Sequence, residues 1–287
     1  MEIDIRRETI ESEGGDIEIV DVIPEKEKTE VPVLFAPGWG TTPKTLEDVQ
    51  LALAGKERRV ISLSHPRIGG EIKGKENYPP EELRKAASIL NVINERGGDQ
   101  FDIVGYSEGG INSILAAKMA PDKIRNIILL NPGGIVNKDN FLKLSGRFLG
   151  GVLNLVKEEM MEGKKVKNTL FTESLKYITK NPARALKEVG EMAETDIKDI
   201  LRDLREKGIG ISIIHGADDS VFSMDDFQRD LKKESVDGFY SVKGDHWESL
   251  KEPDKYMALV DQALTDLEDK KKKEKEEKEN GKKGMLY

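Results

Sequence analysis

The sequence predicts an α/β fold with a mostly parallel central sheet that is flanked by helices. Two observations carry this prediction. Short apolar segments alternate along the chain with longer segments in which apolar residues recur at helical spacing. Several of the short segments are continuously apolar, which is typical of parallel strands that are buried on both faces. Because strands and helices alternate, we expect helices on both faces of one sheet.

The N-terminal part of the chain predicts an antiparallel start to the sheet. Apolar or alternating runs occupy residues 3–6, 16–23 and 31–35. A Gly-containing turn at 13–15 separates the first two runs, and the charged segment 24–28 separates the last two. We therefore expect two antiparallel strands that lead into the first buried strand.

The elements that follow are predicted from the same two patterns. Strand patterns cover residues 59–63, 101–105, 124–130, 210–215 and 238–242. Helical patterns cover residues 80–96, 109–120, 224–233 and 253–267.

Residues 135–207 interrupt this alternation. They contain helical segments at 141–161, 172–179 and 182–204 and no convincing strand, so they predict a helical cap inserted into a core formed by 1–134 and 208–267. The cap carries many apolar residues, which predict a mostly apolar substrate cavity or else simple packing of the cap on the core. They are Phe141, Leu144, Phe148, Leu149, Leu153, Met160, Met161 and Phe171.

Composition excludes several classes of function. The 287 residues include no cysteine, so disulfides, thiolate metal sites and a cysteine nucleophile are excluded. Charged residues make up 35% of the chain and the net charge is −8, which argues against a nucleic-acid-binding face. The chain has no basic, apolar leader and no apolar run of roughly 18 residues, so we expect no membrane span and a cytoplasmic protein.

The C-terminal residues 268–287 form a low-complexity tail of lysine and glutamate. Such a composition buries little apolar surface, so a frayed helix end or a disordered tail is the simplest interpretation. A charged docking segment is the alternative.

The segment Gly105-Tyr106-Ser107-Glu108-Gly109 is the strongest chemical signal in the sequence. A serine hydroxyl is a poor nucleophile and needs a base and an oxyanion-binding site beside it. A G-x-S-x-G turn between a strand and a helix lifts its serine above the sheet. Here a predicted strand precedes the motif and a predicted helix follows it, which indicates that Ser107 is a nucleophile.

Chain order then predicts an acid and a histidine at later strand ends. The predicted strand 210–215 leads into a turn with two candidate carboxylates, Asp218 and Asp219. His246 follows the next predicted strand and is one of three histidines in the chain. We therefore expect His246 to be the general base and one of the two aspartates to orient it.

The order Ser107, Asp218 or Asp219, His246 resembles the α/β-hydrolase superfamily, and in particular its lid-bearing, esterase-like or lipase-like serine hydrolases. The resemblance covers residues 31–267. In this family the acid commonly stands in a G-x-x-D motif that is followed by an apolar residue and a proline. Gly216 to Ser223 then selects Asp219, although Ser223 replaces the proline and leaves Asp218 open.

The resemblance also implies an oxyanion hole built from two backbone N–H groups. One would come from Glu108, which follows the nucleophile, and the other from Trp39, in the turn after the first buried strand. Pro37 stands where the family usually has histidine, and Trp39 is alternatively a core aromatic residue. A Glu108 carboxylate facing the site would repel an oxyanion, so we expect its side chain to point away or to be paired.

The other two histidines carry less information. His65 lies at a strand end where the family has a substrate-facing loop, so it is a candidate for substrate contact, whereas we expect His215 to be structural. The three histidines lack metal-ligand spacing, so no metal and no cofactor is expected.

These observations predict a hydrolase that cleaves small to medium carboxylic esters through an acyl-enzyme, with an acyl ester as its small-molecule partner. Thioesterase, lactonase, amidase, acyltransferase and C–C hydrolase activities would use the same triad. A non-catalytic binding protein on the same fold is a further alternative. The sequence specifies neither the natural substrate nor the oligomeric state.

Overall fold

The computed structural model describes residues 2–12, 14–66, 78–136, 144–147, 150, 176–180 and 182–284, with the backbone alone for 280–284. One eight-stranded sheet, in the order β1-β2-β4-β3-β5-β6-β7-β8, forms the centre of the molecule. The strands are β1 (Ile3–Ile10), β2 (Ile17–Pro24), β3 (Val33–Ala36), β4 (Val60–Leu63), β5 (Phe101–Tyr106), β6 (Ile124–Leu130), β7 (Gly210–Gly216) and β8 (Gly238–Val242).

The pairing of these strands confirms the predicted sheet. β1 pairs with β2 and β2 with β4 in antiparallel register, and every pair from β4 to β8 is parallel. The carboxyl ends of the parallel strands therefore meet at one edge of the sheet, where the connecting loops can bring distant residues together.

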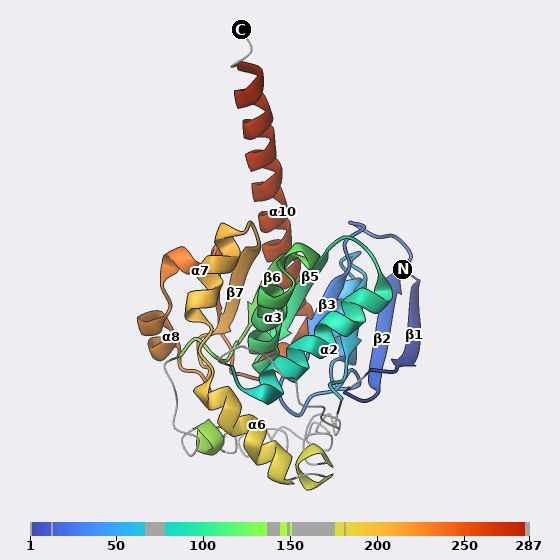
Figure 1. Cartoon of the computed structure of the whole chain (residues 1–287), viewed down its shortest axis with the longest axis vertical. Helices are drawn as coiled ribbons and strands as arrows, with labels where there is room; N and C mark the ends of the chain where they lie inside the picture. Colours follow the sequence, from blue (N-terminus) through green and yellow to red (C-terminus); the bar gives the residue numbers. More distant parts are fainter. Residues whose placement is uncertain are drawn as a thin grey trace.

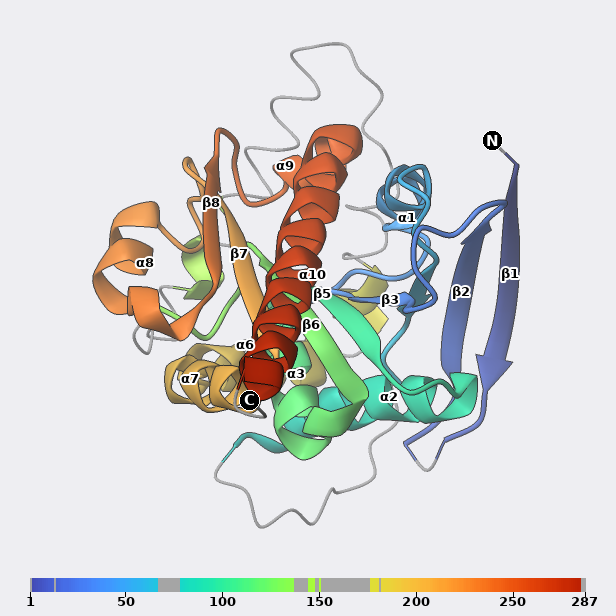
Figure 2. The ribbon, with the colours of Figure 1, turned by 90° about the horizontal axis from the view of Figure 1, so that it is seen from above.

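Helices cover both faces of the sheet (Figures 1 and 2). They are α1 (Glu47–Ala54), α2 (Pro80–Arg96), α3 (Glu108–Met119), α6 (Pro182–Glu194), α7 (Lys198–Glu206), α8 (Met224–Asp230), α9 (Glu248–Lys251) and α10 (Pro253–Gly284), with short 3-10 helices at Pro121–Lys123 and Lys233–Ser235. α2, α3 and α7 lie on one face, and α1 and α10 lie against each other on the other.

Alternating side chains of the central strands supply the two cores. In β3, Leu34 packs with the residues of α2 and α3, whereas Val33 and Phe35 pack with those of α1 and α10. All three side chains are fully buried. A strand that is buried on both faces is apolar on both sides of the sheet, which is why these segments lack the alternation of a surface strand.

Several helices differ from the sequence prediction. Where one helix was expected over 182–204, α6 and α7 are separated at 195–197, α8 ends at Asp230 instead of 233, and α9 was not expected. The sequence pattern predicts no helix at α1, because eight residues contain only about two turns of apolar periodicity. α10 continues beyond 267 to Gly284 instead of ending where its apolar spacing ends. Lysine and glutamate favour helix, and pairs one turn apart such as Lys270 and Glu274, 3.9 Å from nitrogen to oxygen, add support.

The last part of α10 projects from the body of the molecule (Figure 1). At its base Lys270 pairs with Asp237 at 2.6 Å, and Lys271 donates to the carbonyl of Arg125 at 2.5 Å. Asp237 and Arg125 lie near the amino ends of β8 and β6. The projecting part therefore leaves the body at the edge of the sheet opposite the carboxyl ends of its strands.

Between β6 and β7 the described residues are helical at 144–147, 150 and 176–180 and in α6 and α7. α6 packs against α2, and α7 packs against α3 and β7. Of the apolar residues predicted to line a cavity, Leu144 is buried, and Phe141, Phe148, Leu149, Leu153, Met160, Met161 and Phe171 lie outside the described residues. A cap with the boundaries 135–207 stays a prediction.

In the ranges that the structure covers, no helix is both long enough and apolar enough to cross a lipid bilayer.

Candidate active site

Ser107 stands in a tight turn between β5 and α3. Its backbone angles, φ 54° and ψ −120°, are rare for a residue with a side chain and cost about 1–3 kcal/mol, so the surroundings must enforce them. The flanking glycines make this possible: a Cβ on Gly109 would lie 2.3 Å from the carbonyl oxygen of Ala36, and one on Gly105 would lie 2.6 Å from that of Gly109. The glycine spacing of the motif thus follows from the close approach of β5, α3 and the end of β3.

His246 contacts Ser107, although Ser107 follows β5 and His246 follows β8. It lies in the loop between β8 and α9, and its Nε2 atom is 2.9 Å from Ser107 Oγ. Both side chains are buried. A hydrogen-bonded imidazole at this distance can accept the serine proton as the hydroxyl attacks an electrophile.

Asp219 completes the arrangement from the loop after β7. Its Oδ2 atom is 2.8 Å from His246 Nδ1, and its Oδ1 atom accepts hydrogen bonds from the amides of Val221 (2.8 Å) and Phe222 (2.9 Å). Burial alone would raise the pKa of Asp219, but the charge and the hydrogen bond of His246 lower it overall. Asp218 is exposed, so of the two candidates the structure brings Asp219 to His246.

Two residues for which the sequence predicts no role hold the loop of His246. The His246 carbonyl accepts hydrogen bonds from the Tyr106 hydroxyl (3.1 Å) and from Asn131 Nδ2 (2.9 Å), and Asn131 Oδ1 accepts one from the amide of Gly216. Asn131 follows β6 with φ 46°, a conformation that asparagine tolerates better than most residues. A single Asn after a predicted strand is the only signal the sequence offers for it.

The two amides predicted to form an oxyanion hole lie on segments that adjoin Ser107. Glu108 is the first residue of α3, and the first amides of a helix have no acceptor within it. In the turn after β3, a Cβ on Gly38 would lie 3.0 Å from Ser107 Cβ, so the backbone next to Trp39 passes close to the nucleophile.

The Glu108 side chain is paired, as expected from the sequence. Its Oε1 atom is 2.7 Å from Lys85 Nζ on α2, and both side chains are buried. Burial would lower the pKa of Lys85, but the charges of Glu108 and Glu188 raise it well above its usual value, so Lys85 is a cation. This cation compensates the carboxylate beside the nucleophile.

Trp39 has a polar partner in α6. Its indole Nε1 donates to Glu188 Oε2 at 3.1 Å, and its ring meets the ring of Tyr177 edge-on at 5.8 Å. The Trp39 ring is buried, as expected for a core aromatic residue, and a role of its backbone amide as an oxyanion donor stays a prediction.

The remaining histidines have separate contacts. His215 Nε2 is 2.9 Å from the carbonyl of Phe222 and its ring stacks on Phe227 at 4.2 Å, in agreement with a structural role. His65 Nδ1 is 2.7 Å from Ser88 Oγ on α2, and substrate contact by His65 stays a prediction. Among the residues that the structure describes, no group of three or more His, Asp or Glu side chains is arranged to hold a metal ion.

Comparison with known proteins identifies the fold family. A family model described as the alpha/beta hydrolase fold matches residues 31–247. No curated protein matches the sequence.

Solved structures resemble the chain in fold. One is a thermophilic esterase from Thermogutta terrifontis, with TM-score 0.64, 17% identity, and 91% of this chain and 99% of that chain covered. An enzyme described as degrading N-acyl homoserine lactones has TM-score 0.64, 17% identity, and coverage of 89% and 99%. An epoxide hydrolase from Vigna radiata has TM-score 0.62, 13% identity, and coverage of 91% and 98%. At these identities the likeness concerns the fold.

Proposed function

Since this chain belongs to the alpha/beta hydrolase family, we propose that it is a serine hydrolase that cleaves small to medium carboxylic esters through an acyl-enzyme. One observation carries the proposal. Ser107 Oγ is within 2.9 Å of His246 Nε2, and His246 Nδ1 is within 2.8 Å of Asp219, so nucleophile, base and orienting acid form one hydrogen-bonded chain.

In the proposed mechanism, His246 accepts the proton of Ser107 as the oxygen attacks the ester carbonyl. The amides of Trp39 and Glu108 stabilise the resulting oxyanion, and Asp219 stabilises the imidazolium form of His246. His246 then donates its proton to the leaving alkoxide. A water molecule, activated by the same histidine, attacks the acyl-enzyme and releases the carboxylic acid.

A fluorophosphonate probe tests the nucleophile directly, because it labels an activated serine covalently. We expect the wild-type protein to be labelled and Ser107→Ala to be unlabelled. Ser113→Ala is a matched control, since Ser113 is another buried serine, on α3, whose hydroxyl donates to the carbonyl of Gly109. Absence of label on the wild type, or equal labelling of Ser107→Ala, contradicts the proposal.

The substrate class needs a separate measurement. A series of p-nitrophenyl esters of increasing acyl length measures the preference of kcat/KM for chain length. We expect higher activity on these esters than on thioesters, amides and N-acyl homoserine lactones of the same acyl group. A higher kcat/KM on the lactone would move the proposal to a lactonase, the activity described for one of the structures that this chain resembles.

A further inference from the structure

Glu188 of α6 is a fully buried carboxylate that the proposed mechanism does not use. It accepts hydrogen bonds from Trp39 Nε1 (3.1 Å), from Arg184 Nε (3.0 Å) and from the hydroxyl of Tyr177, and it lies 3.6 Å from Lys85 Nζ. Four side chains, of which Arg184 lies on α6 itself, thus hold this carboxylate in one position.

The contacts of Glu188 lead to both proposed oxyanion donors. The first contact is direct, because the indole of Trp39 donates to Glu188 Oε2. The second runs through Lys85, whose Nζ atom lies between Glu188 at 3.6 Å and Glu108 at 2.7 Å. One buried ion pair therefore contacts the side chains of the two residues whose amides would bind the oxyanion.

Removing charges from water is costly, and an apolar pair of similar size is often as stable as a buried ion pair. Stability alone therefore does not account for Lys85 and Glu188. A hydrogen bond to a charged group in a low-dielectric interior is strong and directional. The hydrogen bond from the Trp39 indole to the Glu188 carboxylate therefore opposes a movement of the Trp39 turn away from Ser107.

We propose that Glu188, held by Lys85, is a positioning residue that fixes the Trp39 turn, and through Lys85 the side chain of Glu108, so that both amides face the oxyanion. The proposal rests on the proposed function and adds a role for helix α6, which lies outside the triad. It makes the oxyanion hole depend on the docking of α6 against α2 and the Trp39 turn.

Trp39→Phe and Glu188→Gln test this role. Trp39→Phe removes the indole N–H but keeps an aromatic ring, the backbone amide and every charge, whereas Glu188→Gln keeps the shape and removes the charge. We expect each variant to lower kcat per active site by about tenfold or more, the effect of losing a charge-assisted hydrogen bond that acts in the transition state. We expect KM to stay within about twofold, because the substrate carbonyl carries no full charge.

Active sites are counted by fluorophosphonate titration carried to completion, so that misfolded protein does not enter kcat. The affinity for an alkyl boronic acid, which forms a tetrahedral adduct on serine, should fall in parallel with kcat. The loss of kcat in the double variant should be smaller than the product of the two single losses, because both changes weaken the hydrogen bond between Trp39 and Glu188.

Asp102→Asn is the matched control. Asp102 is fully buried and pairs with Arg125 at 2.9 Å, but it lies at the amino end of β5, away from Ser107. We expect it to lower the denaturation midpoint without changing kcat per titrated site. If Glu188→Gln does not fold, Trp39→Phe alone tests the positioning role, since Trp39→Phe leaves no charge unpaired.

The proposal is overturned if Trp39→Phe and Glu188→Gln reduce stability or the titratable fraction but leave kcat per site unchanged. It is equally overturned if KM rises while kcat is constant, or if the losses in the double variant multiply. A wild-type protein that the fluorophosphonate does not label refutes the proposed function itself, and that result is distinct from all the others.

Discussion

At the scale of single residues, Asp219 and Asp218 occupy adjacent positions with different surroundings. Asp219 is buried and accepts three hydrogen bonds, one from His246 and two from backbone amides, whereas Asp218 is exposed. The carboxylate of Asp219 can therefore hold His246 in one tautomer and stabilise its cation.

We predict that Asp219→Asn lowers kcat/KM for ester hydrolysis by roughly 10³-fold to 10⁴-fold, since asparagine cannot stabilise the imidazolium. The kcat/KM of Asp218→Asn should stay within about twofold of the wild-type value. Steady-state kinetics on one p-nitrophenyl ester compares the three proteins. The reverse ranking would move the acid by one residue.

Glu82 shows how burial determines the charge of a single side chain. It is fully buried on α2, beside Glu108, and accepts a hydrogen bond from Asn112. Burial and then the charge of Glu108 raise the pKa of Glu82 well above its usual value, so the folded protein keeps a proton that the unfolded chain releases.

We predict that Glu82→Gln raises the free energy of unfolding at pH 7. The folded-state pKa of Glu82 is raised, so wild-type stability falls as pH rises above the unfolded value of 4.5, and glutamine removes this loss. Urea denaturation at pH 4 and pH 7 measures the free energy of unfolding of both proteins. The variant and the wild type should differ little at pH 4 and more at pH 7. Glu25→Gln, an exposed position, should differ little at either pH. An equal difference at both pH values would contradict the assignment.

At the scale of elements, Arg58 connects α10 to the segment that precedes β4 through hydrogen bonds and ion pairs. Its side chain is fully buried and donates to Asp261 (2.6 Å), Glu268 (2.9 Å) and Thr265 (3.1 Å), which lie on successive turns of α10. The guanidinium is a single rigid group with several donors, and it thus forms hydrogen bonds with three acceptor side chains on one face of the helix.

We predict that Arg58→Met lowers the free energy of unfolding by about 2–3 kcal/mol, because the two carboxylates lose their buried partner. The loss stays in this range since Asp261 keeps Lys28 at 3.0 Å and Glu268 keeps Arg125 at 2.7 Å. Urea denaturation measures it. Arg6→Met, which changes an exposed pair with Asp4, should cost less than about 0.5 kcal/mol, and an equal cost for both variants would contradict the role of Arg58.

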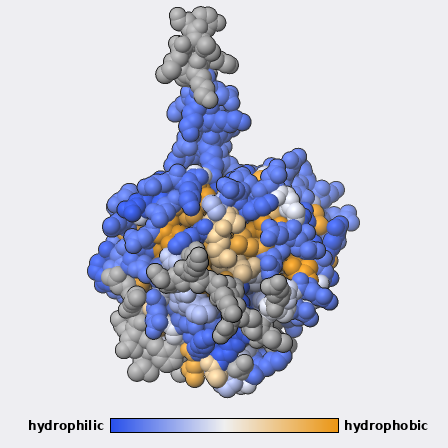
Figure 3. Space-filling model, in the orientation of Figure 1, coloured by the Kyte–Doolittle hydropathy of each residue, from blue (hydrophilic) through white to orange (hydrophobic). Residues whose placement is uncertain are grey.

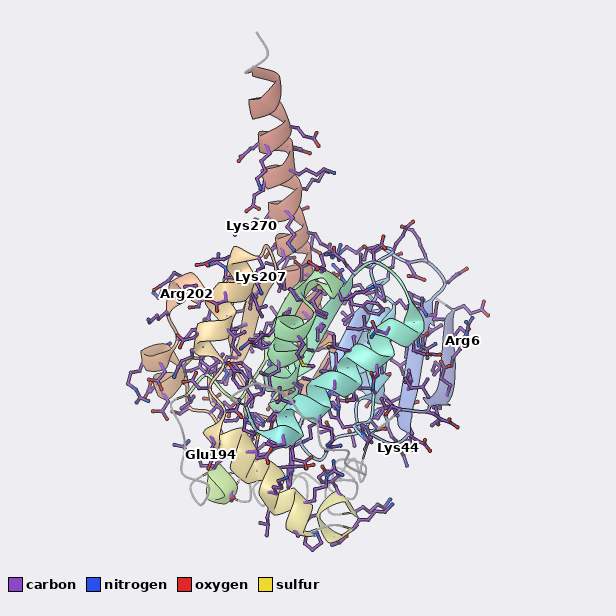
Figure 4. All side chains as sticks on the ribbon, viewed as in Figure 1. Arg6, Lys44, Glu194, Arg202, Lys207 and Lys270 are labelled. Atoms are coloured by element: carbon purple, nitrogen blue, oxygen red, sulfur yellow. The ribbon has the colours of Figure 1, made fainter. Side chains whose placement is uncertain are left out.

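At the scale of the whole molecule, charge is spread over the surface and along the projecting part of α10. Hydrophilic residues dominate the face in Figure 3, and the exposed turns of α10 are hydrophilic on the visible side. The charged residues labelled in Figure 4 lie on separate elements, among them Arg6 on β1, Arg202 on α7 and Lys270 on α10. A net charge of −8 with both signs interspersed opposes self-association of such a surface.

The sheet was predictable because its signals are local. Short, mostly apolar segments identify β5, β6 and β7, and helical spacing identifies α2 with the same boundaries as the structure. α1 was missed since it is short, and the end of α10 was misplaced since charged pairs extend a helix beyond its apolar stripe.

The sequence alone determined the turn around Ser107 and the order in which an acid and a histidine follow it, because a strained turn between a strand and a helix requires glycines at fixed spacing. The tertiary structure decided which aspartate meets His246, and it brought Asn131 to the loop of His246. It also decided that Glu188 meets Trp39, 149 residues away, and that Lys85 compensates Glu108. These contacts depend on how helices pack across the sheet, and no local pattern records that packing.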